Sequence, residues 1–91
     1  MMLRRNPAVL FQPVGEGAIL LHTQQEVYFG LNEVGAQVWQ LLSVAGTDLT
    51  AVVDELSRRY PEVEPELLRA DVRELVEGLA REGLLQLAAA A

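Results

Sequence analysis

The sequence predicts a small α+β domain in which an antiparallel sheet precedes three helices. Two patterns in the chain point to this class: apolar residues alternate with a period of two in the first third, and they recur at helical spacing in the remainder. The length of 91 residues adds a third constraint, because a chain of this size buries one hydrophobic core and no more. We therefore expect a single domain over residues 1–91, with an ordered core spanning residues 9–87.

The predicted sheet has three strands. Val9-Leu10-Phe11 is a short apolar run that ends before Pro13, and Ala18 to His22 is a second run, apolar enough to be largely covered. Thr23 to Glu26 then provides a hairpin connection to the third strand, Val27 to Leu31. The alternation in the third strand places three apolar side chains on one face of the sheet: Val27, Phe29 and Leu31.

Three helices are expected after the sheet. Asn32 is a suitable N-cap for the first helix, and Thr47-Asp48 offers the cap of the second, which Pro61 stops. The third helix should cover residues 65–82, because proline suits the first turn, acidic residues suit the positive end of the helix dipole, and Gly83 ends the pattern. Two short helices, a longer third and a small sheet make a winged-helix-like architecture.

The composition argues against several classes of function. The formal net charge is −6, and the seven cationic residues are all arginine, whereas nucleic-acid binding depends on neutralising phosphates. The absence of cysteine excludes disulfides, thiolate metal sites and cysteine nucleophiles. No run approaches the ~20 apolar residues that span a bilayer, and the N-terminus lacks a secretory signal. We expect a cytoplasmic protein that binds neither membrane nor nucleic acid.

No catalytic or metal-binding constellation is evident. His22 is the only histidine, and its position suggests a surface or strand-end residue rather than a ligand or a base. Ser43 and Ser57 have no partner base, and the acidic residues are dispersed. We therefore expect a binding protein without cofactor or metal, and not an enzyme.

The third strand is a candidate docking edge. It contains neither a charged residue nor proline between Val27 and Asn32, although sheet edges are usually protected by such residues. An unprotected edge accepts an extended peptide by strand addition. The sequence equally allows the strand to be central, paired on one side by 18–22 and on the other by 9–11. Apolar residues of the third helix (Leu67, Leu68, Val72, Leu75 and Val76) would provide a groove beside an open edge.

The chain resembles the PqqD-like proteins. The residues that carry the resemblance run in order along the chain: Gly17–His22, Tyr28–Asn32, Gly35–Trp39 with Leu41-Leu42, Val53–Leu56, Tyr60, Asp71-Val72, Leu79 and Gly83–Leu85. This family comprises the recognition elements that bind precursor peptides in ribosomal natural-product (RiPP) pathways. The resemblance implies three strands followed by three helices. It also implies a leader peptide that pairs antiparallel with the third strand and packs on the third helix.

Within the family, the chain is more similar to the standalone leader-recognition subunit of lasso-peptide pathways than to the pyrroloquinoline-quinone protein. Tyr28-Phe29 and Trp39 carry this likeness, and Gln24-Gln25-Glu26 replaces the Pro-Glu-Gly of the latter. The likeness implies a leader with a Tyr and a Pro three residues apart, whose aromatic ring fills the groove. It also implies a separate cysteine-protease leader peptidase to which the subunit presents the leader.

The resulting hypothesis is a monomeric leader-binding domain, with dimerisation through the same edge left open. The candidate peptide-binding residues are Val27, Tyr28, Phe29, Gly30, Leu31, Leu68, Arg69, Asp71, Val72, Arg73, Leu75 and Val76. Asp71 would meet a polar leader group, and Arg69 or Arg73 would engage leader acids. A charge at Val72 or Leu75 should weaken leader binding more than folding. The alternative is a winged-helix DNA-binding transcriptional regulator, which would need to present Arg58-Arg59 or Arg69 and Arg73 to the major groove.

Overall fold

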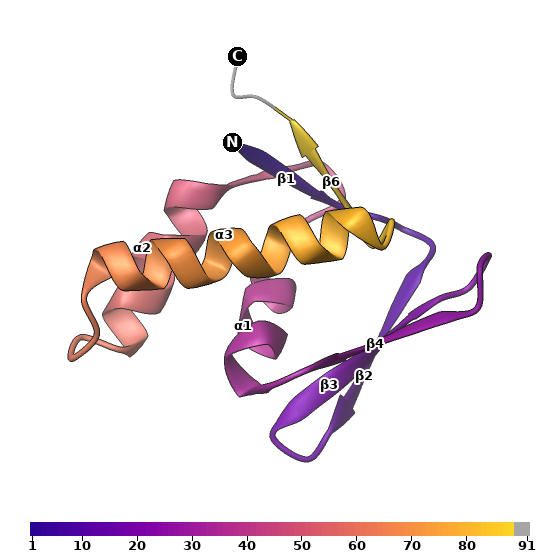
Figure 1. Ribbon diagram of the computed structural model, residues 1–91, viewed down its shortest axis with the longest axis horizontal. Helices are drawn as coiled ribbons and strands as arrows, with labels where there is room; N and C mark the ends of the chain where they lie inside the picture. The colour runs from indigo at the N-terminus through magenta and orange to yellow at the C-terminus, as the bar shows by residue number, and fades with distance from the viewer. Residues whose placement is uncertain (89–91) are drawn as a thin grey trace.

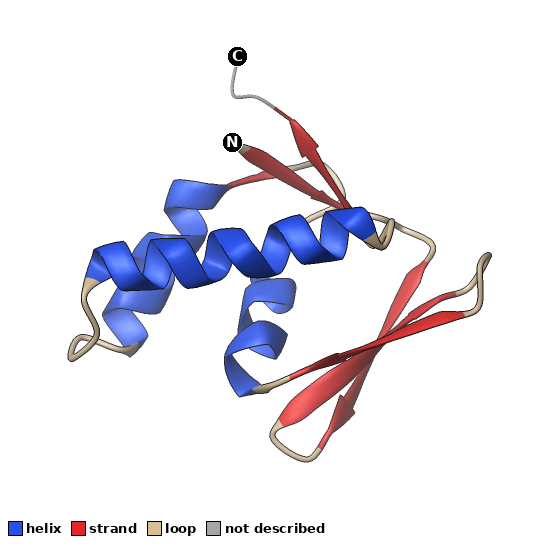
Figure 2. Cartoon of the chain, viewed as in Figure 1, coloured by secondary structure: helices blue, strands red, loops and turns tan. Residues whose placement is uncertain are grey.

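The computed structural model describes residues 1–88 as an α+β fold of two three-stranded antiparallel sheets and three helices (Figure 1). Figure 2 shows the helices on one side of the view and the β2–β3–β4 sheet on the other. The elements in chain order are β1 (Met2–Arg5), β2 (Val9–Val14), β3 (Gly17–His22), β4 (Val27–Leu31), α1 (Glu33–Leu41), β5 (Thr47–Asp48), α2 (Leu49–Arg59), α3 (Pro65–Arg81) and β6 (Leu85–Ala88). The predicted fold class is confirmed, and the three predicted strands and three predicted helices are present, although β2 continues past the expected stop at Pro13 to Val14.

The three helices begin as their sequences predict. The side-chain oxygen of Asn32 accepts a hydrogen bond from the Gly35 amide at 2.8 Å and caps α1. The Asp48 carboxylate accepts one from the Thr50 amide at 2.7 Å and caps α2. Pro65 occupies the first turn of α3, where its missing N–H is not needed. Local sequence therefore determines the start of each helix.

The sheet formed by β2, β3 and β4 has the order β2-β3-β4. β3 is central, and each of its neighbours is antiparallel to it. In the second hairpin Ala18 lies opposite Leu31 and His22 lies opposite Val27, so β4 is paired over its full length on one side. Glu26 closes the hairpin with a φ of 54°, a left-handed conformation that is uncommon outside glycine.

A second sheet, of order β5-β1-β6, was not anticipated from the sequence. β1 pairs with β6 over four residues, with Leu3 opposite Leu87, and its other edge pairs with the short β5. The sequence-based expectation began the ordered core at residue 9, yet Leu3 is fully buried. In Figure 1, β1 and β6 lie together at the top of the molecule, apart from the β2–β3–β4 sheet at the lower right.

The hydrophobic core joins both sheets to the helices. Its largest fully buried side chains come from every layer of the fold: Leu3, Leu20, Trp39, Leu56, Leu79 and Leu84. α2 and α3 pack on each other, and α1 packs against β3 and β4. None of the helices in residues 1–88 has both the length and the apolar character needed to cross a membrane. The core thus fixes β4 and α3 in one rigid frame.

Candidate functional site

β4 is an edge strand. Within residues 1–88 it pairs with β3 alone, and no strand lies along its other side. Successive residues of an antiparallel strand direct their N–H and C=O groups to opposite sides, so alternate residues of Val27–Leu31 present unpaired backbone groups outward. The alternative that β4 is central is therefore wrong, because β3 holds that place. The strand retains the hydrogen-bonding capacity that an added strand needs.

The side chains of β4 follow the predicted alternation. Tyr28 is 70% exposed and Gly30 is exposed, whereas Val27 and Phe29 are half-buried. Leu31 is buried in the core. Leu31 thus anchors the end of the strand to the fold, while the outward backbone groups and the Tyr28 side chain remain accessible.

The apolar face of α3 divides into core residues and flank residues. Val76 has no exposed surface and Val72 has 2%, so both belong to the core. Leu68 is nearly as buried, at 6%, whereas Leu75 is half-buried and packs on the edge of the core. Val76 therefore has no surface to offer a guest. Val72 also lines the pocket described below, but a charge there should act on folding first, since an unpaired buried charge is strongly destabilising.

An open pocket of about 330 Å³ lies where β4 ends. It connects the residue after β4 to the first half of α3, and its lining is Asn32, Val34, Tyr60, Val63, Leu68, Asp71 and Val72. Most of these side chains are apolar, with the polar groups of Asn32, Tyr60 and Asp71 among them. A pocket of this composition suits an apolar side chain that carries or adjoins a polar group.

One flank of α3 continues this pocket. Asp71 and Leu75 follow Leu68 at spacings of three and seven residues, so these side chains share a side of the helix. At the far end of the helix, a Cβ added at Gly83 would stand 3.9 Å from the side-chain oxygen of Gln25 in the β3–β4 turn. Segments next to β4 thus meet α3 near both of its ends, at Asn32 and at Gln25.

The two candidate arginines of α3, Arg69 and Arg73, lie in different surroundings. Arg73 forms an ion pair with Glu77 at 3.6 Å, and it lines a separate hollow with Ala70 and Arg81 on the side of the helix away from the pocket. Arg69 is half-buried and does not line the pocket. The structure therefore brings Leu68, Asp71 and Leu75 together on the pocket flank, and places Arg73 and Val76 elsewhere.

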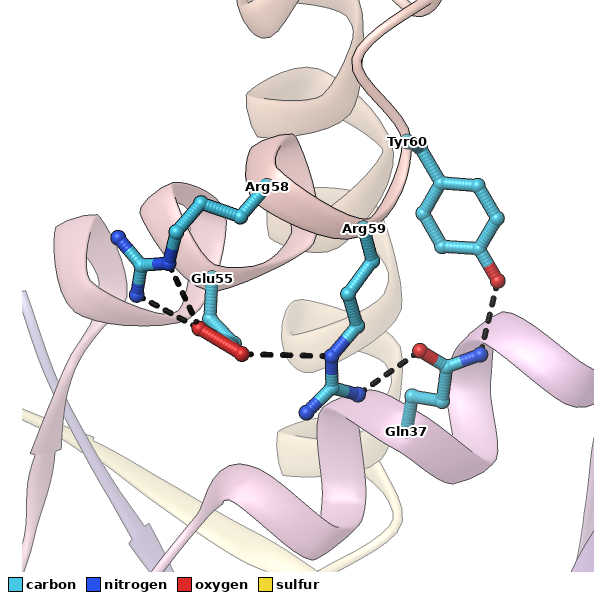
Figure 3. A network of polar contacts seen from close by, with 5 residues as sticks. All are labelled: Gln37, Glu55, Arg58, Arg59 and Tyr60. Atoms are coloured by element: carbon cyan, nitrogen blue, oxygen red, sulfur yellow. Dashed lines mark hydrogen bonds and ion pairs between the residues drawn. The ribbon is translucent and has the colours of Figure 1, made fainter.

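A polar network behind the pocket was not anticipated from the sequence (Figure 3). Glu55 accepts two hydrogen bonds from Arg58, at 3.0 and 2.6 Å, and forms an ion pair with Arg59 at 3.4 Å. Arg59 donates to the side-chain oxygen of Gln37 at 2.8 Å, and the Gln37 amide nitrogen donates to the Tyr60 hydroxyl at 2.8 Å. In the sequence, Tyr60 stood out as one of the residues that carry the family resemblance, which says nothing of this network.

Charge also shapes the acid–base behaviour of that network. The hydrogen bonds and the positive charge of Arg58, followed by the charge of Arg59, hold the pKa of Glu55 below its ordinary value. Arg58 and Arg59 are thus engaged with an acid. In this arrangement both guanidinium groups are paired with a carboxylate, whereas a DNA-binding helix uses such groups to contact phosphates.

His22 ends β3, as expected of a strand-end residue, but it does not lie on the surface. It is 3% exposed, and its Nδ1 accepts from the amides of Gln24 and Gln25 at 3.3 Å each. Its Nε2 lies 3.3 Å from the Asn6 side chain. The described residues contain no group of three potential metal-binding side chains. The burial of His22 was not anticipated, because it depends on Asn6 and the turn, which local sequence does not reveal.

The chain matches one protein-family model and is similar to two solved structures named here. The family model for coenzyme PQQ synthesis protein D (PqqD) matches residues 17–85. The structure of TbiB1 in complex with the TbiA(beta) leader peptide is similar, with 31% identity and a TM-score of 0.82 over 96% of this chain and 99% of that one. A lasso peptide synthetase B1 complexed with the leader peptide is also similar, with 27% identity and a TM-score of 0.77 over 93% and 98%. No curated protein matches.

These matches confirm the resemblance that the ordered residue series indicated, including the likeness to lasso-pathway proteins. They give no support to the DNA-binding alternative. The family match runs from the start of β3 to the first residue of β6, and so includes β4, the pocket and α3. The chain belongs to the PqqD family of RiPP recognition elements.

Proposed function

We propose that this protein binds the leader of a ribosomally made precursor peptide of the lasso class. The leader adds as a strand to the free edge of β4 and packs its side chains on α3. The observation that carries this proposal is the unpaired edge of β4, Val27–Leu31, next to a pocket and an apolar helix flank. The similar TbiB1 and B1 proteins, whose structures hold leader peptides, support it.

The guest should run antiparallel to β4. In that direction its N-terminal part passes Leu31 and reaches the pocket beside Asn32, and its C-terminal part leaves near Gln25. The leader Tyr that the family resemblance implies would place its ring in the pocket, against Val34, Val63 and the other apolar lining residues. Asp71, at the pocket rim, would meet a polar group of the leader.

The domain would act by positioning and not by chemistry. A guest held along β4 has its C-terminal part outside the groove, where a separate cysteine-protease leader peptidase has access to it. We propose a monomer in the free state, with its edge available to the guest. This role requires neither cofactor nor metal.

The proposal is tested by amide hydrogen exchange, with a synthetic TbiA(beta) leader peptide as the probe. In the free protein the outward amides of β4 should exchange quickly, because water is their only partner. On addition of the peptide, alternate residues of Val27–Leu31 should become protected, and resonances of Leu75 and Asp71 should shift. Protection spread evenly over the protein, or confined to segments outside β4, would contradict strand addition.

A further inference from the structure

The polar network behind the pocket fixes the direction of its own hydrogen bonds. A guanidinium group has five N–H donors and no acceptor. The group of Arg59, 2.8 Å from the Gln37 side-chain amide, must therefore face the amide oxygen. This contact determines the amide orientation, which interatomic distances alone often leave ambiguous.

The orientation of Gln37 determines the role of Tyr60. With its oxygen held by Arg59, Gln37 turns its NH2 group toward the Tyr60 hydroxyl, 2.8 Å away (Figure 3). An NH2 group only donates, so the phenolic oxygen must accept this hydrogen bond. The hydroxyl hydrogen then points away from Gln37, and within residues 1–88 it forms no hydrogen bond to an acceptor.

We infer that Tyr60 offers this hydrogen as a donor to an oxygen of the bound peptide, and that Gln37 is the positioning residue that keeps it available. Tyr60 is one of the residues that line the pocket at the end of β4, so a guest residue in the pocket lies beside its side chain. In the free protein, water takes this hydrogen. A guest carbonyl oxygen, or a hydroxyl oxygen on the side chain in the pocket, replaces that water.

This inference rests on the proposed function and adds a polar requirement to it. The apolar residues of the pocket accept any side chain of suitable size, whereas a directed donor favours a guest with an acceptor oxygen at this point. A guest that fills the pocket without such an oxygen displaces the water and leaves the hydroxyl unpaired, which lowers the affinity for that guest. The network thus adds a hydrogen-bond requirement to the selection of the guest, which apolar packing alone does not provide.

Two variants separate the donor from the shape of the pocket. Tyr60→Phe removes the hydroxyl and retains the ring. Gln37→Glu retains the hydroxyl and the contact with Arg59, but the introduced carboxylate only accepts and takes the phenolic hydrogen for itself. A purely structural role for Gln37 would be preserved by Gln37→Glu, because the carboxylate has the same shape as the amide and pairs with Arg59. The control Gln40→Glu places the same charge on the exposed side of α1.

The measurement is the Kd for the TbiA(beta) leader peptide, with the thermal midpoint recorded for each variant. We expect Tyr60→Phe and Gln37→Glu each to raise Kd by about two- to tenfold, the range of one hydrogen bond. The combined variant should be no weaker than Tyr60→Phe alone, since both changes remove the same bond. Gln40→Glu should bind as the unaltered chain does.

Wild-type affinity in Gln37→Glu would overturn the inference, whether or not Tyr60→Phe is weakened. Equal losses in Gln37→Glu and Gln40→Glu would also overturn it, because charge alone would then explain the effect. If the unaltered chain does not bind the leader at all, the proposed function fails, and the inference falls with it. These outcomes distinguish failure of the donor from failure of leader binding.

Discussion

Gly17, at the start of β3, lies directly against the backbone of Leu31, at the end of β4: the Cβ of any larger residue at position 17 would overlap the Leu31 carbonyl oxygen. The overlap is with main chain, so no side-chain rotation relieves it. The contact lies next to Asn32, where the pocket begins. A glycine that carries no unusual φ is therefore required for the close approach of the two strands.

Gly17→Ala should lower the free energy of unfolding by about 1–3 kcal/mol, the cost of forcing an extra group into a packed site. It should also weaken peptide binding, because β4 must move away from β3 at the end that leads into the pocket. Chemical denaturation measures the first effect, and titration with the TbiA(beta) leader measures the second. Gly30→Ala is the matched control for the stability measurement, since a Cβ at Gly30 meets nothing within 4 Å. Equal stability of the two variants would refute the structural reading of Gly17.

The pocket flank of α3 is tested by two leucines on the same helix. Leu75 is half-buried and packs on the edge of the core, whereas Leu67 is 55% exposed; neither of them lines the pocket itself. Leu75→Glu should raise the Kd for the leader by about tenfold or more, as expected from losing the burial of one apolar side chain. Leu67→Glu should leave Kd unchanged. Similar losses in both variants would indicate a general charge effect and would remove Leu75 from the site.

This comparison replaces the broader expectation that a charge at either Val72 or Leu75 reports on binding. With 2% of its surface exposed, Val72 is part of the core, and a charge there acts on folding first. Thermal denaturation of Leu75→Glu is the necessary companion measurement. A folded Leu75→Glu variant with a lowered midpoint but intact leader affinity would place the guest elsewhere.

The Glu55 network predicts how stability depends on pH. Arg58 and Arg59 hold the pKa of Glu55 below its ordinary value of 4.5. A carboxyl whose pKa is depressed by folding stabilises the fold above its unfolded pKa and loses that effect as the pH falls through its folded pKa. The difference in thermal midpoint between the unaltered chain and Glu55→Gln should therefore be constant near neutral pH and shrink below about pH 4.5.

Arg58→Gln provides the control for this titration. In that background Glu55→Gln should have a smaller effect at neutral pH, because the main cause of the pKa shift is gone. The effect in the unaltered chain should be modest, since the pair is exposed to solvent and salt. A difference that persists unchanged in acid would show that Glu55 acts through packing and not through its charge.

The sequence predicted the parts of the fold that local patterns specify. The alternation in Val27–Leu31 predicted β4, and the caps at Asn32 and Asp48 predicted where α1 and α2 begin. β1 and β6 were missed because two strands from opposite ends of the chain specify each other only by pairing. Such long-range pairing leaves little trace in the period of a four-residue segment.

The candidate site, like the fold, was predicted only where local patterns specify it. The strand edge and the helix flank follow from hydrophobic patterns, but whether β4 is an edge strand depends on the order β2-β3-β4, which a pattern does not contain. Tyr60 and Gln37 come from different helical segments and meet only in three dimensions. Polar groups that act through a partner far away in the sequence are thus the ones that local reasoning misses.

The mode of docking makes a further prediction about the guest. Alternate residues of an antiparallel strand direct their amides toward the partner strand, so only every second amide of the bound leader segment donates to β4. N-methylation of those amides removes a donor and inserts a methyl group between the strands. A methyl group on an intervening amide points away from β4 and leaves the pairing intact. Kd measured for a series of singly N-methylated TbiA(beta) leaders should therefore rise and fall with a period of two along the paired segment, by about tenfold at each sensitive position.

The series also tests where the pairing stops. β4 has five residues, so the alternation should extend over a comparable stretch of leader and end where the guest enters the pocket beside Asn32. Beyond that point the side chain should matter more than the amide, and replacing the pocket residue by alanine should cost more than N-methylation. A helical guest would instead give sensitivity at spacings of three and four residues. That pattern would contradict strand addition even if the leader bound tightly.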